Sequence, residues 1–401
     1  MTILPNDPPL KDIRVLDFTR VLAGPFCSMN LSDLGAEIIK VEIPYRGDDT
    51  RAYPPFINGV SSYYLSLNRG KKSITINLKT EEAVKIIYEL TTKCDVVVEN
   101  FRPGVTERLK VDYETLKKIN PKIIYCSISS FGQTGPYAQW PGYDLIIQGM
   151  SGLMGITGEK DSDPMRIGVA VEDINAGLHA VIAILAAIRV RDLTGVGQYI
   201  DLSMFDAGVS WMTYVAGNYF ATGNVPQRMG TAHPSIVPYQ AFKTGDEKYI
   251  LIAGGNDRLF VILCTILGLE RLVDDPEYIS NKVRVENKKK LIPILQEAFM
   301  KKPRDAWLDR LRDSGFPCAP VYTIDEVFAD PQVHHRDMVV EMDHPTAGVI
   351  KQIGTPFKLS ESKIVLKSYP PKLSEHTVEI LTELLRYSES EIKTLREKGV
   401  I

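Results

Sequence analysis

The carboxylate with the clearest chemical context in this chain is Asp173. It follows the short apolar run 167–171 and precedes a long apolar segment, which predicts that it lies at the start of a helix. Free backbone N–H groups and the helix dipole favour an anion at such a place. A carboxylate there can cap the helix or act as a nucleophile. Position alone favours the cap and leaves the nucleophile open.

The segment after Asp173 is predicted to form a long buried helix. Its apolar residues fall on nearly every side of a helical wheel, which is typical of a core helix. Arg189, Arg191 and then Gly195 supply the chemistry of a C-terminal stop. The longest apolar stretch, around 180–188, is too short to span a bilayer, so we expect no membrane partner.

Short apolar strands alternate with helices along the first 130 residues. The predicted strands are 13–18, 37–42, 73–77, 95–99 and 123–128, and helices fit at 23–34, 81–92 and 112–118. This alternation is typical of an α/β fold with a parallel sheet that helices cover on both faces.

The rest of the chain suggests a second, smaller α/β domain. Residues 131–165 are rich in Gly, Pro and Ser and are expected to form loops, and 198–202 is a further strand. A linker at 223–238 leads to a strand at 249–253 and helices near 257–267, 287–300 and 303–313. The chain is expected to end in a helical hairpin with a capping box at Ser388 and a stop at Gly399. We therefore predict a large domain over 1–222, to which 340–401 returns, and a small domain over 223–339.

Composition excludes several classes of protein. The 401 residues are 44% hydrophobic and 24% charged with a net charge of −3, which gives no footprint for nucleic acid. The N-terminus lacks the pattern of a signal peptide. Five scattered cysteines without a CxxC pair indicate a reduced, cytoplasmic protein, and the six histidines include no metal-binding motif. We expect no metal site.

Known nucleotide and hydrolase motifs are absent. Glu42 follows Asp17 at roughly the spacing of a ribose-binding acid, but the turn between them has no GxGxxG. Arg69–Ser73 lacks the upstream glycine of a phosphate loop, and no GxSxG elbow occurs. Basic residues do gather near the predicted strand ends, where they could bind a phosphorylated nucleotide or form a solvated surface: Arg20, Lys40, Arg46, Arg51, Lys71, Lys72, Lys79, Arg102 and Arg108.

Several segments together make the chain recognisable. They are 14–19 (RVLDFT), 23–25 (AGP), 34–42 (LGAEIIKVE), 97–104 (VVENFRPG), Tyr143-Asp144, 168–177 and 194–198 (TGVGQ). In this order and spacing the chain resembles the class III CoA-transferases (formyl-CoA transferase or CaiB/BaiF family) along essentially its whole length. The resemblance implies a Rossmann-like large domain, a small domain and an interlocked homodimer whose active sites draw on both chains.

The resemblance also assigns roles to residues. The family's nucleophilic aspartate falls on Asp173, and Tyr143 and Asp144 fall on positions that line the acyl pocket. The CoA-binding positions fall on Leu22, Ala23, Ile76 to Lys79, Asn100, Phe101, Arg102 and Arg108. No permanently bound cofactor is implied, because CoA and acyl-CoA are substrates.

Departures from the family pattern reduce the range of expected substrates. Leu22 replaces the glutamine of formyl-CoA transferases, which argues against oxalate and formate. The segment 230–242 looks most like the subgroup that moves CoA from succinyl-CoA to glutarate. Arg228, Gly230 and His233 lie where a dicarboxylate would bind, Arg166 is a further candidate, and His233 is equally well explained as a loop histidine bonded to backbone.

Two other functions remain as alternatives. Related racemases use a His–Asp pair, but Tyr143 stands at the histidine's position and suits α-proton exchange poorly. A non-catalytic acyl-CoA-binding paralogue would use the same sheet edge without turnover.

Overall fold

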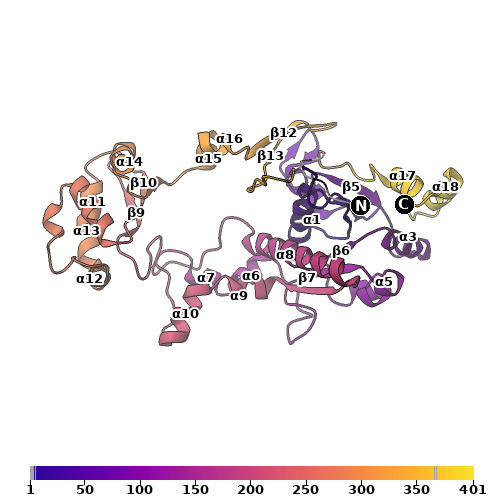
Figure 1. Cartoon of the computed structure of the whole chain (residues 1–401), viewed down its shortest axis with the longest axis horizontal. Coiled ribbons are helices and arrows are strands. Elements are labelled where there is room, and N and C mark those ends of the chain that lie inside the picture. Colours follow the sequence, from indigo (N-terminus) through magenta and orange to yellow (C-terminus); the bar gives the residue numbers. More distant parts are fainter. Residues whose placement is uncertain (1–3, 5, 365, 367) are drawn as a thin grey trace. The chain divides into compact units, whose positions relative to one another are not determined.

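The computed structural model describes residues 4, 6–364, 366 and 368–401, and the chain divides into two compact units. The large unit comprises residues 1–153, 166–217 and 332–401. The small unit comprises residues 154–165 and 218–331. Figure 1 shows the elements of each unit along the chain.

A six-stranded sheet forms the centre of the large unit, in the order β5-β2-β1-β6-β7-β8. Its strands are β1 (Arg14–Asp17), β2 (Glu37–Glu42), β5 (Lys71–Thr75), β6 (Val96–Glu99), β7 (Ile124–Ser129) and β8 (Tyr199–Ser203). Every neighbouring pair is parallel, which confirms the predicted parallel α/β sheet. The chain builds outward from β1 to β5 and then returns to place β6 on the other side of β1. A crevice for ligands forms at such a switch point, at the carboxyl ends of the strands.

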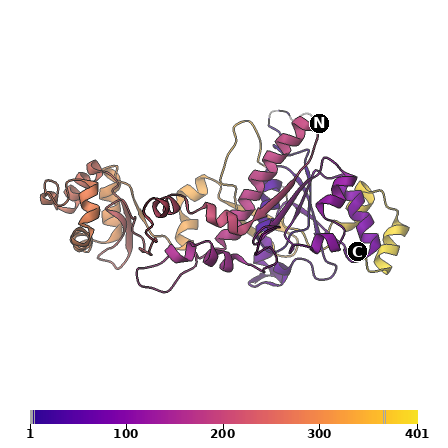
Figure 2. The ribbon, with the colours of Figure 1, turned by 90° about the horizontal axis from the view of Figure 1, so that it is seen from below.

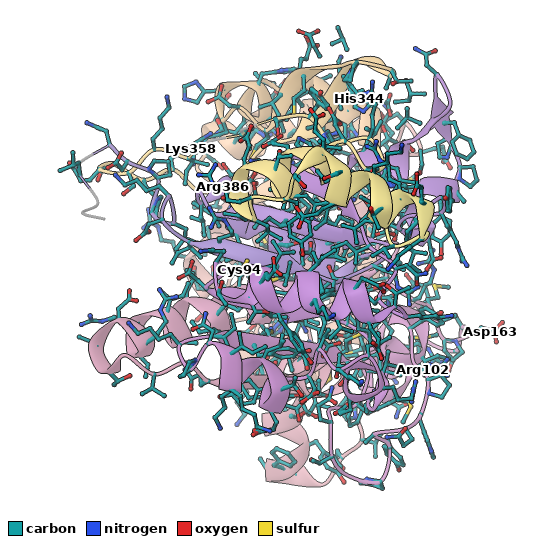
Figure 3. The ribbon with its side chains drawn as sticks, turned by 90° about the vertical axis from the view of Figure 1, so that its right-hand side faces the viewer. Cys94, Arg102, Asp163, His344, Lys358 and Arg386 are labelled. Carbon is teal, nitrogen blue, oxygen red and sulfur yellow. The ribbon has the colours of Figure 1, made fainter. Side chains whose placement is uncertain are left out.

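Helices cover both faces of this sheet. On one face α1 (Ala23–Asp33) and α8 (Val171–Thr194) share a core with Val15, Ile38 and Val98. On the other face the core includes residues from α3 (Glu81–Thr91), α5 (Tyr113–Ile119), the π-helical turn η3 (Ile380–Leu384) and α18 (Glu389–Glu397). Figure 2 shows the sheet close to edge-on between these groups, and Figure 3 views the second face, with Cys94 just after α3 labelled.

The long helix α8 is only half covered, which corrects the prediction that it is buried on all sides. Leu178, Ile182 and Leu185 are 42%, 61% and 36% exposed, whereas Ala180 and Ile184 are fully buried. Gly195 ends the helix in the left-handed conformation, as predicted. Among the described helices, α8 alone has the length and apolar composition to cross a bilayer, a feature that core helices of soluble proteins share.

The remaining elements of the large unit surround the sheet. The segment 131–165, expected to be loop, contains α6 (Asp144–Met150) and the single turn α7 (Leu153–Ile156), whose last residues belong to the small unit. At the C-terminus Ser388 and Glu391 form the predicted capping box. The other elements are η1 (Asp49–Ala52), β3 (Phe56–Ile57), β4 (Val60–Ser61), α2 (Ser62–Leu65), α4 (Val105–Arg108), α9 (Met204–Ser210), α16 (Pro331–His335), β12 (Val339–His344), β13 (Gly348–Ile353) and α17 (Thr377–Glu379). The helix α10 (Thr213–Thr222) begins in the large unit, and its residues from 218 on belong to the small unit.

The small unit packs helices on a three-stranded antiparallel sheet in the order β11-β10-β9, where we had expected an α/β unit. Its core gathers Phe242, Leu263, Leu295 and Trp307. Its elements are β9 (Tyr239–Lys243), β10 (Tyr249–Ala253), α11 (Asp257–Leu267), η2 (Glu270–Leu272), α12 (Asn281–Glu286), α13 (Lys288–Phe299), α14 (Arg304–Asp313), β11 (Cys318–Pro320) and α15 (Ile324–Ala329).

Candidate active site

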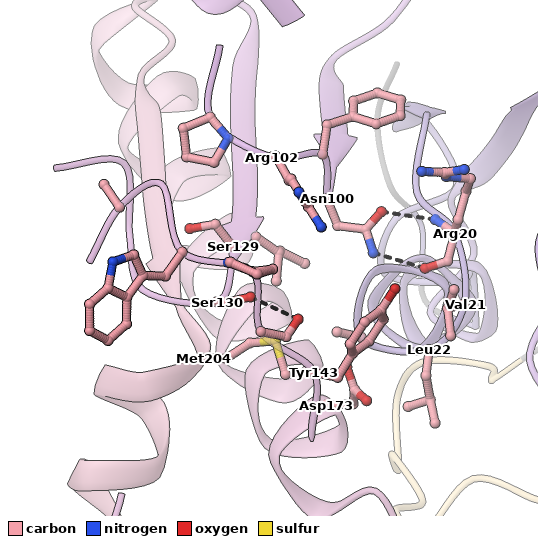
Figure 4. Close-up of a pocket in the computed structure, with 18 of the residues that line it drawn as sticks. Arg20, Val21, Leu22, Asn100, Arg102, Ser129, Ser130, Tyr143, Asp173 and Met204 are labelled. Atoms are coloured by element: carbon pink, nitrogen blue, oxygen red, sulfur yellow. Dashed lines mark hydrogen bonds between the residues drawn. The ribbon is translucent and has the colours of Figure 1, made fainter. Parts of the chain in front are cut away.

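A cavity of about 180 Å³ opens at the carboxyl ends of β1, β6 and β7, at the switch point of the large sheet. Asp173, Tyr143, Leu22 and Asn100 all line it (Figure 4). The loop after β1, the loop after β6 and the first turn of α8 therefore meet there. Residues far apart in the sequence come together because parallel strands end at one edge.

The first turn of α8 holds Asp173, but Asp173 does not cap this helix. The N-cap position is Ala170, and the Oδ1 atom of Asp144 accepts a hydrogen bond from the Glu172 N–H at 2.9 Å. A carboxylate from α6 thus satisfies a free donor of α8. The helix-cap interpretation of Asp173 is wrong, and its carboxylate faces the cavity.

Opposing effects act on the pKa of Asp173. Burial, together with the nearby charges of Asp144 and Glu172, raises the pKa of Asp173 to about 7. A hydrogen bond from the Ala23 backbone N–H acts in the opposite direction and lowers this pKa. A carboxylate with a pKa near neutrality is a stronger base and nucleophile than an ordinary aspartate, and it still ionises at physiological pH.

The close approach of α1 to α8 brings Ala23 to Asp173. One turn after Asp173, a Cβ atom built on Gly177 would lie 2.7 Å from the carbonyl oxygen of Ala23 and 3.1 Å from the ring of Phe26. Only glycine leaves room for this contact. Asp173 therefore sits at the N-terminal ends of two helices, whose dipoles both favour a negative charge.

The loop that precedes α1 is tied to the loop that follows β6. The Arg20 N–H donates to Oδ1 of Asn100 at 2.9 Å, and Nδ2 of Asn100 donates to the Arg20 carbonyl at 2.8 Å. The guanidinium of Arg20 lies over the Phe101 ring at 5.7 Å. Two of the strand-end loops that form the cavity are thus joined as one wall.

Most residues predicted to bind CoA line this cavity or a second hollow. Leu22, Ala23, Asn100, Phe101 and Arg102 lie in the Asp173 cavity. Lys79 and Arg108 instead line a separate hollow of about 460 Å³, together with Lys85 and Lys110. The side chain of Ile76 is buried in the core, and its N–H donates to the Glu42 carbonyl, so it presents no side chain to a ligand.

The predicted substrate residues lie in different places. Tyr143 lines the cavity and is 72% exposed, whereas Asp144 is buried and caps α8. Arg228, Gly230 and His233 belong to the small unit. Nδ1 of His233 accepts a hydrogen bond from the Ser235 N–H at 3.1 Å, which is the backbone-bonded state that the sequence allowed.

Several cations of the expected basic cluster are internal. Lys40 and Lys71 are fully buried and pair with Asp48 at 2.9 Å and with Asp17 at 3.5 Å. Arg51 likewise pairs with Glu42 at 2.7 Å. These side chains serve neither a solvated surface nor a phosphate, because other charges in the large unit already hold them.

Other members of the cluster remain available. Lys79, Arg102 and Arg108 are exposed and form no ion pair within the described part of the chain (Figure 3 labels Arg102). These three are the cations that could meet a phosphate.

Some lining residues were not anticipated from the sequence. Ser129, Ser130, Trp140 and Met204 also line the cavity. Ser129 is the last residue of β7, and a polar residue at the end of an apolar strand is the sequence signal that could have indicated it. Trp140 comes from a loop whose course no periodic pattern predicts.

Comparison with known proteins identifies the family. The profile of CoA-transferase family III matches residues 10–377. The chain belongs to the class III CoA-transferases. A succinyl-CoA:glutarate CoA-transferase of Mus musculus is 48% identical over 98% of this chain and 90% of its own length. A succinate–glutarate CoA-transferase of Agrobacterium fabrum is 43% identical over 96% of this chain and 98% of its own.

Solved structures agree with the fold of this CoA-transferase. A CaiB/BaiF family protein from Brucella suis superposes with a TM-score of 0.85 at 43% identity, covering 94% of this chain and 100% of that one. Rv3272 from Mycobacterium tuberculosis gives a TM-score of 0.84 at 30% identity over 93% of this chain and 99% of that one. The family predicted from the sequence motifs is confirmed.

Proposed function

We propose that this CoA-transferase moves CoA from succinyl-CoA to a dicarboxylic acid such as glutarate, with Asp173 as the nucleophile. One observation carries the proposal: the Asp173 carboxylate faces the switch-point cavity between two helix N-termini, with Asp144 already acting as the cap. The names of the mouse and Agrobacterium relatives support the choice of acids.

The proposed reaction is a ping-pong exchange. A carboxylate oxygen of Asp173 attacks the thioester carbon of the donor, CoA thiolate leaves, and a mixed anhydride forms. The thiolate then attacks the Asp173 carbonyl carbon, so the donor acid leaves and an aspartyl-CoA thioester remains. The acceptor carboxylate reverses these steps. One thioester replaces another, so the exchange needs neither ATP nor a metal, and covalent catalysis divides one hard step into easier ones.

The first turn of α1 supplies charge stabilisation in this scheme. Each tetrahedral intermediate carries an oxyanion, and backbone N–H groups at a helix N-terminus can donate to it. The Ala23 N–H lowers the pKa of Asp173, and the Gly24 N–H follows it in the same turn, whereas Pro25 has no N–H and the Phe26 N–H donates to the Leu22 carbonyl.

The exposed cations support binding of CoA phosphates. Arg102 borders the cavity, and Lys79 and Arg108 line the second hollow with Lys85 and Lys110. A guanidinium can pair with a phosphate in a bidentate manner. The proposed CoA site extends from the acyl end beside Asp173 toward these cations.

Within the small unit, Arg228 offers a donor to a carboxylate. Its Nη2 atom donates to the Ser162 carbonyl at 2.5 Å, while its Nε atom is buried without a partner in the described chain. A buried unpaired donor is costly, and a carboxylate would satisfy it.

Racemisation is not favoured by this cavity. Its described lining contains Tyr143 beside Asp173 and no histidine. A tyrosine has an ordinary pKa of about 10, which suits proton exchange near pH 7 poorly.

A homodimer is part of the proposal. Leu178, Ile182 and Leu185 form an exposed apolar stripe on α8. An exposed apolar stripe of this kind is typical of a protein interface. The family resemblance implies an interlocked pair of chains, and the five free cysteines support a reducing, cytoplasmic location.

Trapping the covalent intermediate tests the mechanism. The protein is incubated with succinyl-CoA and then with hydroxylamine, which converts an aspartyl thioester to a hydroxamate, and its peptides are analysed by mass spectrometry. We expect a hydroxamate on Asp173 and none in Asp173→Asn. Exposed Asp163→Asn is the matched control and should be labelled like the unchanged protein.

Two outcomes contradict the proposal. A hydroxamate on another carboxylate means that the nucleophile is wrong. Labelled succinate that does not exchange into succinyl-CoA, with the protein folded and binding CoA, indicates a binding protein without turnover.

A further inference from the structure

A buried ion pair lies directly beneath the loop that precedes α1. Nζ of Lys40 on β2 lies 2.9 Å from Oδ2 of Asp48, and both side chains are fully buried. The same Nζ donates to the Thr19 carbonyl at 2.8 Å. Lys40 thereby connects the pair to the first residue of the loop 19–23.

The other oxygen of Asp48 holds the middle of this loop. Oδ1 accepts a hydrogen bond from the Val21 N–H at 3.3 Å, and it also accepts from the N–H and hydroxyl of Thr50 at 3.0 and 2.8 Å. Val21 has a φ of 70°. A β-branched residue rarely adopts this left-handed conformation, which is strained and persists only where surrounding contacts impose it.

The loop ends at the N-terminus of α1, beside the nucleophile. Leu22 is the N-cap of α1 and Ala23 its first residue; both line the cavity with Asp173, and the Ala23 N–H lowers the pKa of that carboxyl. The direction of this N–H depends on the backbone of the two residues before it. A relaxed φ at Val21 would turn the start of α1 relative to Asp173.

Stability alone is a weak reason for this pair. Burying two charges costs several kcal/mol each, and apolar replacements are often at least as stable, so such pairs are better explained by specificity of conformation. The strained residue that contacts Asp48 lies on the wall of the cavity, where strain is expected to serve function.

We propose that the buried Lys40–Asp48 pair is a positioning device for Asp173: it holds Val21 in its left-handed conformation and so keeps the N-terminus of α1, with the Ala23 N–H, directed at the nucleophilic carboxylate. This inference rests on the proposed role of Asp173. Neither Lys40 nor Asp48 lines the cavity, so both act through the loop and not on the substrate.

Other charges surround both ends of the device. Asp17, Glu42, Lys71 and Arg51 face the ion pair. Asp144 and Glu172 face Asp173, and Tyr63 of α2 lies within reach of its charge. None of these groups is changed in the test, so they form a constant background.

The test compares Asp48→Ala with a matched control. Asp33→Asn breaks another buried pair of the same unit, Asp33–Arg69 (2.6 Å), at the opposite end of α1. The readout is the pH dependence of kcat/KM for succinyl-CoA:glutarate exchange. In Asp48→Ala the Asp173 carboxylate loses the N–H that favours its charged form, so the acid limb should move upward by on the order of one pH unit and kcat should fall by roughly tenfold. Asp33→Asn should keep the acid limb of the unchanged protein.

A rescue variant separates positioning from damage to the fold. Glycine adopts a positive φ without strain, so Val21→Gly in the Asp48→Ala background should return the acid limb toward its original pH. If Asp48→Ala does not fold, the comparison is made with Asp48→Asn, which removes the charge of the pair but keeps an acceptor for the Val21 N–H, so a smaller upward shift of the acid limb is expected. A folded Asp48→Ala protein with an unshifted acid limb overturns the proposal, as does a shift of equal size in Asp33→Asn.

Titration without substrate makes the inference independent of turnover. The carboxyl ¹³C signal of Asp173, assigned by its loss in Asp173→Asn, should titrate at higher pH in Asp48→Ala. A protein that shows no exchange activity but this NMR shift contradicts the proposed function and supports the device. The converse result, activity with no shift, contradicts the device alone.

Discussion

At the scale of the residue, Asp173 combines two opposed requirements. A nucleophile must be ionised, and helix termini at α1 and α8 favour ionisation. It must also be poorly solvated, and burial beside Asp144 raises its pKa to about 7. The balance places the ionisation of Asp173 close to physiological pH, where both forms coexist.

The pH dependence of transfer follows from this balance. Only the carboxylate form of Asp173 attacks the thioester, so kcat/KM should rise with pH along one acid limb centred near pH 7. Below that limb the rate should fall about tenfold per pH unit. Initial rates of exchange between pH 5 and 9 measure this acid limb. A limb near pH 4 would mean that Asp173 has the pKa of an ordinary aspartate and would contradict the prediction.

The raised pKa of Asp173 should also lower the free energy of unfolding at neutral and higher pH. The folded-state pKa of Asp173 lies above its ordinary value of 3.8, so the folded protein binds more protons than the unfolded chain between about pH 4 and 7. Stability is therefore lost as the pH rises through about 7. Asp173→Asn should gain roughly 2 kcal/mol at pH 8 and little at pH 4. Urea unfolding at both pH values measures the difference, and an equal gain at both would exclude the charge as its cause.

At the scale of the element, the contact between α1 and α8 decides the site. The N-terminus of α1 reaches Asp173 only because Gly177 has no side chain where the two helices cross. The position of the Ala23 N–H beside Asp173, the loop 19–23 and the cavity wall all depend on this distance. A single glycine thus connects packing of the core to chemistry at the cavity.

Gly177→Ala tests this dependence. The added methyl group would lie 2.7 Å from the Ala23 carbonyl, so we expect a loss of about 1–3 kcal/mol in the free energy of unfolding and a larger fractional loss of kcat. Gly217→Ala on α10 is the control, because nothing lies within 4 Å of its added Cβ. It should be neutral or slightly stabilising. Equal behaviour of the two variants in denaturation and kinetics would contradict the steric argument.

At the scale of the whole molecule, two features of the large unit point beyond one chain. The strand order places the cavity at the switch point, where the loops after β1 and β6 diverge. The opposite side of α8 presents Leu178, Ile182 and Leu185 to solvent. One helix therefore supports the nucleophile at its first turn and carries an unpartnered apolar stripe farther along.

Ile182→Glu tests the role of that stripe. The side chain is 61% exposed, so the change should not disturb the core of an isolated chain, but a buried charge in an interface is strongly unfavourable. We expect a dimer in the unchanged protein and dissociation or poor assembly in the variant, measured by light scattering after size-exclusion chromatography. Thr265→Glu, on the exposed surface of α11, is the control and should leave the mass unchanged. A monomeric unchanged protein would contradict the proposed homodimer.

Much of this architecture could be predicted from the sequence. The alternation of strands and helices, the stop at Gly195 and the capping box at Ser388 are local patterns, because each depends on residues a few positions apart. The ordered motifs were enough to identify the family, and the resemblance, not the helix position alone, assigned the nucleophile to Asp173.

Other features depended on contacts between distant parts of the chain, and only the tertiary structure decided them. Asp144 replaces Asp173 as the helix cap because the start of α6 lies against the first turn of α8 in space. Lys40 and Lys71 could be taken from the sequence as free cations, but in the structure they form ion pairs with buried carboxylates. The burial of α8 on one side only is likewise set by what packs on it. Local periodicity indicates which residues can share a face of a helix or strand. Ion pairing, helix capping and exposure depend instead on which distant segment packs against that face.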